Sequence, residues 1–187
     1  MQLRVRPVSS VCRGRMFKSF LGEKADAEKN WVCDNEADEA MKRQDYETAI
    51  SLHERFLEKN PENALALYHL GYAYSQTGDH LKEVSYYEKA ISYGFKNDFI
   101  FYNLGMAYAE LNDLEKSVGA YKKALEIDPD SADIHFELAM AYYQMGIADK
   151  QAEEEFLNAI KIDPEHVEAR LYLSLLYREL GEINQYE

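Results

Sequence analysis

The sequence predicts an all-α fold, a solenoid built from repeated pairs of helices. Three observations lead to this prediction: a spacing of 34 residues that recurs along the chain, apolar residues at helical intervals within that spacing, and few helix-breaking residues. The 187 residues include 4 prolines and 9 glycines against 15 tyrosines, and hydrophobic residues make up 47%. This composition is typical of a folded domain rather than of a disordered chain.

The spacing appears in several independent series, and steps that cross residues 142–156 are one residue longer. The series are Leu70, Leu104 and Leu138; Tyr74, Tyr108 and Tyr142; His53, Tyr87, Tyr121 and Phe156; and Ala90, Ala124 and Ala159. We expect the extra residue in the turn at 146–149, because a loop accepts an insertion more easily than a packed helix does.

Each repeat has the pattern of two amphipathic helices. In residues 98–131 the first helix buries Leu104 and ends near Asn112, a residue type that tolerates the left-handed backbone of a helix end. The second helix ends before Pro129, and Ser131 is placed to cap the helix that follows.

Small residues recur inside the first helices, at Gly71, Gly105 and Ala139. Glycine inside a helix costs up to about 1 kcal/mol relative to alanine. Its recurrence therefore indicates a position where two helices cross closely.

These residues resemble the signature of the tetratricopeptide repeat family. The third repeat shows that signature at Phe101, Leu104-Gly105, Tyr108, Asn112, Ser117, Tyr121, Ala124 and Pro129. The resemblance covers residues 30–187 and implies a right-handed α-solenoid, with helix-turn-helix units at 30–63, 64–97, 98–131 and 132–166 and a final helix at 167–181. The second unit departs from the family pattern, since Glu83 replaces a small residue and Phe95 replaces the terminal proline.

Residues 1–29 are predicted to be a basic, disordered N-terminal tail. Its first 22 residues carry five basic residues and no acidic one. This composition resembles a mitochondrial transit segment, so a mitochondrial location stands as the alternative to a cytoplasmic one. A true start at Met16 is a further alternative.

The net charge of −13 excludes some classes of partner. Because the tail is basic, the repeat region is more acidic than the whole chain, and such a surface repels the phosphates of nucleic acids. Basic protein segments match it better. No stretch approaches the roughly 18 apolar residues that a membrane span needs. Two cysteines are too few for a disulfide framework, which suits the cytoplasm.

No constellation of residues predicts catalysis, a cofactor or a metal site. The five histidines lack the spacing of a metal-binding motif, and His53, in an aromatic slot of the repeat, is expected to pack in the core. The sequence also has no glycine-rich phosphate loop and no nucleophile elbow. We therefore expect that the protein is not an enzyme.

The resemblance implies that first helices line a concave groove with the residues that packing does not use. Carried over, the peptide-binding positions are Tyr68, His69, Tyr72, Phe99, Tyr102, Asn103, Met106, Phe136, Glu137, Met140 and Tyr143. Aromatic residues and methionine, together with a few acidic residues, suit a peptide that is apolar to mildly basic. The alternative for each ring is that it packs between neighbouring helices.

The leading functional hypothesis is a protein–protein interaction module, an adaptor or scaffold. Two alternatives stay open: a secretion-type or assembly chaperone, and the regulatory repeat region of an enzyme whose catalytic part lies elsewhere. The final helix can be a solvating cap, but it is rich in leucine for a solvated face. This composition indicates either that the chain is part of a longer repeat array or that the helix is covered by a partner or a second copy of the chain.

Overall fold

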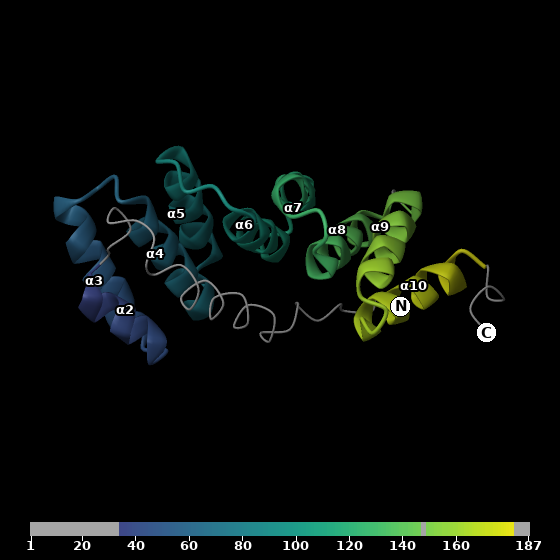
Figure 1. Cartoon of the computed structure of the whole chain (residues 1–187), viewed down its shortest axis with the longest axis horizontal. Helices are drawn as coiled ribbons and strands as arrows, with labels where there is room; N and C mark the ends of the chain where they lie inside the picture. The colour runs from purple at the N-terminus through teal and green to yellow at the C-terminus, as the bar shows by residue number, and fades with distance from the viewer. Residues whose placement is uncertain (1–33, 147–148, 182–187) are drawn as a thin grey trace. The chain divides into compact units, whose positions relative to one another are not determined.

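The computed structural model describes residues 34–146 and 149–181, which contain nine helices and no strand. In chain order the helices are α2 (Asn35–Lys42), α3 (Tyr46–Lys59), α4 (Ala64–Thr77), α5 (His80–Ser92), α6 (Asp98–Glu110), α7 (Leu114–Ile127), α8 (Ala132–Met145), α9 (Asp149–Ile162) and α10 (Val167–Glu179) (Figure 1). The predicted tail lies outside the described residues. The all-α prediction is confirmed.

The helices form two compact bodies, which meet in sequence between Phe95 and Lys96. The N-terminal body contains α2 to α5, and the C-terminal body contains α6 to α10. Within each body every helix packs on the next one along the chain. This order of contacts is the one that a stack of helix-turn-helix repeats produces.

The turns inside the repeats keep the predicted spacing. Gly78 and Gly146 follow their helices with φ angles of 82° and 66°, and Asn112 takes the same left-handed conformation with a φ of 59°. The sequence did not single out Gln44, which occupies this position in the first repeat with a φ of 62°. Gln44 therefore adopts a conformation that a non-glycine side chain disfavours.

Capping residues begin the second helix of three repeats in the same way. The Oδ1 atoms of Asp45, Asp79 and Asp113 each accept a hydrogen bond from the backbone N–H three residues further on, at 3.2–3.4 Å. As predicted, Ser131 caps α8. These bonds satisfy N–H groups that the first turn of a helix leaves without partners.

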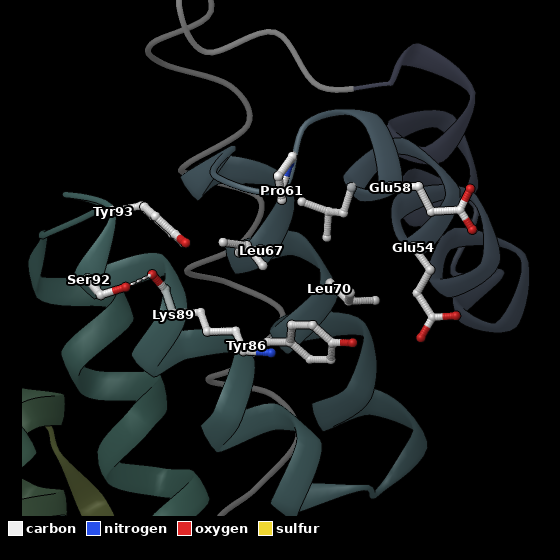
Figure 2. A pocket seen from close by; sticks show the side chains of 10 residues that line it. Glu54, Glu58, Pro61, Leu67, Leu70, Tyr86, Lys89, Ser92 and Tyr93 are labelled. Atoms are coloured by element: carbon white, nitrogen blue, oxygen red, sulfur yellow. Dashed lines mark hydrogen bonds between the residues drawn. The ribbon is translucent and has the colours of Figure 1, made fainter.

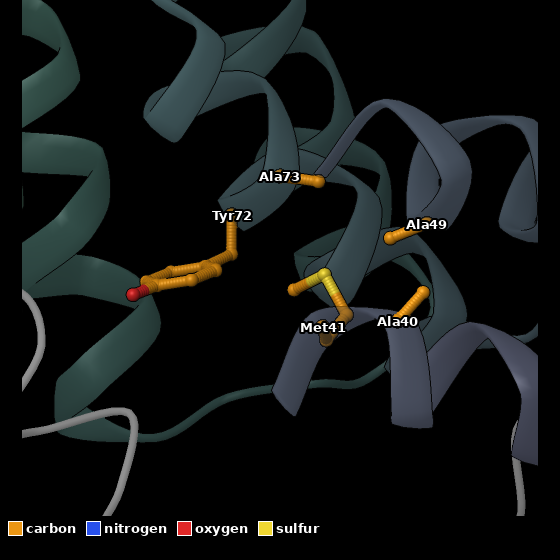
Figure 3. Close-up of a cluster of buried hydrophobic side chains, with 5 residues drawn as sticks. All are labelled: Ala40, Met41, Ala49, Tyr72 and Ala73. Atoms are coloured by element: carbon orange, nitrogen blue, oxygen red, sulfur yellow. The ribbon is translucent and has the colours of Figure 1, made fainter. Parts of the chain in front are cut away.

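The core of the N-terminal body shows why the helices can pack closely. Ala40 and Met41 of α2, Ala49 of α3 and Tyr72 of α4 belong to one buried cluster (Figure 3). A Cβ atom added to Gly71 of α4 would lie 2.6 Å from the ring of Tyr87 in α5, so any larger residue here would require the ring or the helices to shift.

The two departures from the family pattern have structural explanations. Glu83 is buried, and its Oε2 atom lies 2.8 Å from Nδ1 of His80, which supplies a polar partner for the buried carboxylate. Phe95 stacks on Tyr68 with ring centroids 4.7 Å apart. An aromatic ring thus fills the space at the end of the second repeat.

The extra residue of the fourth repeat falls next to the turn, as predicted. Gly146 follows Asn112 by 34 residues, whereas α9 begins 35 residues after the start of α7. Residues 147–148 themselves lie outside the described part of the chain.

The final helix, α10, begins at Val167 and packs on α9. It buries Leu173 and Leu176, while Val167 and Leu171 are 69% and 53% exposed. Among the described residues, this leucine-rich helix is therefore covered on one face only.

Candidate functional site

The predicted groove residues lie on the first helices α4, α6 and α8, as the resemblance implied, but most of them are buried. The buried ones are Tyr68, His69, Tyr72, Tyr102, Asn103, Met106, Phe136, Glu137 and Met140. Phe99 and Tyr143 are only partly buried. The first helices of the middle repeats are thus covered on nearly all sides.

In the N-terminal body, Tyr68 and Tyr72 hold neighbouring helices together. The ring of Tyr68 lies between Tyr87 of α5, at a centroid distance of 5.7 Å, and Phe95. Tyr72 belongs to the cluster shared with α2 and α3, and its ring meets that of Tyr46 edge-on at 6.3 Å. These two rings therefore pack between neighbouring helices instead of lying open to a ligand.

The C-terminal body repeats this arrangement. Tyr102 of α6 packs on Tyr121 of α7 with centroids 5.9 Å apart. Phe136 of α8 lies 6.0 Å from Phe156 of α9 and 5.9 Å from Tyr172 of α10. Such aromatic pairs are worth about 0.5–1.5 kcal/mol each beyond the area that they bury.

Tyr143 is the most accessible tyrosine of the predicted set. Its hydroxyl group donates a hydrogen bond of 2.9 Å to Oε1 of Glu179 on α10. Burial, followed by this bond to a carboxylate, raises the pKa of Tyr143 to about 12. The hydroxyl group of Tyr143 therefore stays protonated at neutral pH and is hydrogen-bonded to α10, while the side chain remains partly exposed.

A cleft in the N-terminal body offers a surface that the sequence analysis did not find. It has a volume of about 500 Å³ and lies between the second helices α3 and α5, over α4 (Figure 2). The lining residues are Glu54, Leu57, Glu58, Pro61, Leu67, Leu70, Tyr86, Lys89, Ser92 and Tyr93. Leu67 and Leu70 are buried and form an apolar floor, and Tyr93 at the rim is 47% exposed.

The two sides of the cleft differ in charge. Glu54 and Glu58 are exposed on α3, whereas Lys89 on α5 lies over the ring of Tyr86, 5.0 Å from its centroid. Oε1 of Glu54 accepts a hydrogen bond of 2.7 Å from the hydroxyl of Tyr74, whose ring stacks on Tyr86. Burial and the bond to Glu54 raise the pKa of Tyr74. These contacts fix Glu54 in place and keep its charge at the mouth of the cleft.

One feature of the sequence could have indicated this cleft: a pair of acidic residues on α3. Glu54 and Glu58 are one helical turn apart on α3, so they share a face of that helix. The approach of α5 that closes the other side comes from helix packing, which the periodicity of the sequence does not specify.

A second group brings together side chains from three successive helices of the first two repeats: Asp38 of α2, His53 of α3 and His69 of α4. Nδ1 of His69 donates a hydrogen bond of 3.0 Å to Oδ1 of Asp38, and Nε2 of His53 lies 4.0 Å from the same oxygen. One ligand atom from each side chain can be chosen so that all lie within 4.8 Å of one another.

His53 is fully buried, as expected for its aromatic slot. Burial lowers the pKa of His53 to about 4, and the neighbouring His69 acts in the same direction. Neither ring nitrogen of His53 has a hydrogen-bond partner within the part of the chain that the structure describes. Leaving such a buried polar group unsatisfied costs about 1–3 kcal/mol.

Comparisons with known proteins agree with the fold. Family models described as TPR repeat and tetratricopeptide repeat match residues 105–146 and 35–97. No curated protein sequence matches the chain significantly.

Three solved structures illustrate the likeness. A crystal structure of MamA has a TM-score of 0.78 at 22% identity, covering 83% of this chain and 90% of that one. MamA 41-end from Desulfovibrio magneticus RS-1 has a TM-score of 0.77 at 17% identity, with coverages of 87% and 91%. YrrB has a TM-score of 0.75 at 20% identity, with coverages of 91% and 86%. At these identities the likeness concerns the fold.

Stacked helical pairs with an accessible cleft define a protein-interaction scaffold, a class that is generally non-catalytic. Within this class the chain belongs to the tetratricopeptide repeat family. No helix in the described ranges is long and apolar enough to cross a membrane.

Proposed function

We propose that this protein binds a segment of another protein that is apolar and mildly basic, and that the cleft between α3 and α5 receives it. The observation that carries the proposal is an apolar floor beside two exposed carboxylates, those of Glu54 and Glu58. Apolar side chains of the partner would lie over this floor and contact Leu57, Tyr86 and Tyr93, which line the cleft and keep exposed surface. A lysine or arginine would approach the carboxylates.

The size of the cleft limits what it can hold. A volume of about 500 Å³ is in the range of sites that bury a few side chains. We infer that the cleft anchors a few residues of the segment. YrrB, whose fold this chain shares, is described as a TPR protein with an unusual peptide-binding site, which supports a peptide as the ligand.

The charge of the chain supports the choice of a basic partner. With a net charge of −13, the protein attracts cationic segments and repels acidic ones before contact. Within the described residues, Glu58 forms no ion pair, so its carboxylate can pair with the partner without breaking a bond in the protein.

The groove of the first helices remains the competing location. Its accessible members are Phe99 and Tyr143, and a ligand there would contact these rings rather than the nine buried residues. Rings that already pack against neighbouring helices offer less new contact area to a partner. For this reason we favour the cleft.

Binding to two matched peptides tests the proposal. The peptides share one apolar core and carry either lysine or glutamate at their ends, and fluorescence anisotropy measures binding at low and moderate salt. We expect binding of the lysine peptide only, weakening as salt rises. Preference for the glutamate peptide would contradict the proposed partner.

A charge reversal locates the site. Glu58→Lys should weaken binding of the lysine peptide about tenfold, because a rim attraction becomes a repulsion. Glu126 is the matched control, since it is exposed on α7 at the equivalent position two repeats further on. Glu126→Lys makes the same change in net charge and should have a much smaller effect. If Tyr143→Ala weakens binding while Glu58→Lys does not, the first-helix groove is the site.

We propose that the protein acts without catalysis, as a binding module.

We also propose that α10 takes part in self-association. Val167 and Leu171 lie one turn apart on α10 and are exposed, whereas the first helices α4, α6 and α8 are each covered by the helix that follows. We infer that this face of α10 contacts a second copy. Light scattering should show a dimer that Leu171→Glu dissociates and Leu157→Glu, on the exposed side of α9, does not. Equal masses for all three proteins would contradict this contact.

A further inference from the structure

The side chains of Asp38, His53 and His69 meet where α2, α3 and α4 pack together. We propose that they form a binding site for a divalent transition-metal ion of the zinc type. Two imidazoles and one carboxylate are ligands that such an ion prefers, and three protein ligands leave one position for water.

The distances suit an ion of this size. Ligand atoms about 2.0–2.1 Å from a tetrahedral zinc ion lie roughly 3.3 Å from one another. The separations from Oδ1 of Asp38 are 3.0 Å to Nδ1 of His69 and 4.0 Å to Nε2 of His53, one below that value and one above it. All three ligand atoms lie within 4.8 Å of one another, so small side-chain rotations would bring them to the ion.

Coordination requires a lone pair on each nitrogen. In the present arrangement Nδ1 of His69 carries the proton that it donates to Asp38. The other neutral tautomer, with the proton on Nε2, presents Nδ1 to the ion without any change in charge. His53 already has both nitrogens unengaged by hydrogen bonds within the described ranges, and Nε2 points toward Asp38.

The repeats provide an internal comparison that separates a metal site from ordinary packing. Two repeats further on, Met106, Tyr121 and Glu137 occupy the positions equivalent to Asp38, His53 and His69. The C-terminal body packs with these residues, which include no imidazole. The fold therefore does not require two histidines at these positions, and their presence in the first repeats calls for a different reason.

Access and function follow from the location. The side chain of Asp38 is 25% exposed, whereas those of His53 and His69 are almost fully buried, so an ion would enter past Asp38. Once bound, it would join three successive helices and act as a structural clamp on the N-terminal body.

The expected affinity is moderate. Nδ1 of His53 has no acceptor among the described residues to orient the ring, and such partners typically raise metal affinity 10–100-fold. We therefore expect micromolar rather than nanomolar binding.

Titration of the full chain with Zn²⁺ and Co²⁺, after removal of metals with a chelator, tests the site. Calorimetry should show one ion per chain, and Co²⁺ should give the visible spectrum of a nitrogen and oxygen site. His53→Phe keeps an aromatic ring in the slot, His69→Gln removes the second imidazole, and Asp38→Asn changes the partly exposed ligand. Each should weaken binding at least about tenfold.

His135→Gln is the matched control, because His135 also lies beside a carboxylate, 2.6 Å from Oε2 of Glu155, but in the C-terminal body. This variant should bind the ion like the unchanged protein. A second control replaces both Cys12 and Cys33 by serine, since thiolates bind the same ions. Circular dichroism confirms that each variant is folded, and Asp38→Asn serves as the test if the histidine variants are not.

Three results would overturn the proposal. The first is no binding of either ion at micromolar concentrations. The second is binding that survives in Asp38→Asn and His53→Phe. The third is binding that disappears in the cysteine double variant, which would assign the ion to the thiols.

Discussion

Gly105 of α6 lies directly against the ring of Tyr121 of α7: a Cβ atom added to the glycine would be 2.5 Å from Cε1 of the tyrosine. Gly71 and Tyr87 have the same relationship in the preceding repeat, where the corresponding distance is 2.6 Å. The contact sets how closely the two helices of a repeat approach, because any larger side chain would separate them.

Gly105→Ala should therefore destabilise the protein, even though alanine is the better helix former. Forcing a methyl group into this contact should cost about 1–3 kcal/mol. Gly119 is the matched control, because it lies inside α7 with nothing within 4 Å of its added Cβ atom. Gly119→Ala should stabilise by up to about 1 kcal/mol. Urea unfolding measures both; a Gly105→Ala protein as stable as the parent would show that the ring moves freely.

Gln44→Gly should stabilise the protein. Gln44 has a φ of 62°, a left-handed conformation that costs a non-glycine residue about 1–2 kcal/mol. Part of the gain is lost to the greater entropy of glycine in the unfolded chain, so we expect about 1 kcal/mol. Asn112→Gly should gain less, because asparagine tolerates this conformation. The midpoints of urea unfolding report both changes, and a loss of stability in Gln44→Gly would contradict the assignment of strain.

Leu104→Ala should lower the free energy of unfolding by about 2–5 kcal/mol, because it leaves a cavity in the core of the C-terminal body. Leu104 is 7% exposed, whereas Leu111 at the end of the same helix is 37% exposed. Leu111→Ala should therefore cost much less. Similar losses in both variants would mean that Leu104 is not a core residue.

The stability of the metal-free protein should fall as the pH drops from 6.5 towards 4. Burial lowers the pKa of His53 from 6.5 to about 4, so the unfolded chain binds more protons than the folded one between these values. The loss should approach about 3 kcal/mol at about 1.4 kcal/mol per pKa unit. The neighbouring carboxylates of Glu155 and Asp133 raise the pKa values of His135 and His166, and the stability contributed by these two groups is already complete below pH 6.5.

Urea unfolding at a series of pH values, with chelator present, measures this loss. His53→Phe removes the titrating group and should flatten the stability curve between pH 6.5 and 4.5. Below that range Glu155, whose pKa is lowered, adds its own acid sensitivity in both proteins. The same slope in both proteins would place the acid sensitivity in another group.

The sequence by itself determined the repeat and its local structure. A periodic series such as Leu70, Leu104 and Leu138 can be read without coordinates, because each helix pair buries the same positions as the next. The turn at Asn112 and the cap at Ser131 were likewise predictable, since they depend on backbone conformation and on neighbours within three residues.

The tertiary structure alone decided how the candidate sites are built. Tyr68 looked free for a ligand because helical periodicity cannot show that Tyr87 and Phe95 close over its ring. The approach of His53 and His69, 16 residues apart and on different helices, depends on how α3 crosses α4. Helix crossing is set by the sum of many side-chain contacts between elements, so spacing along one helix does not contain it.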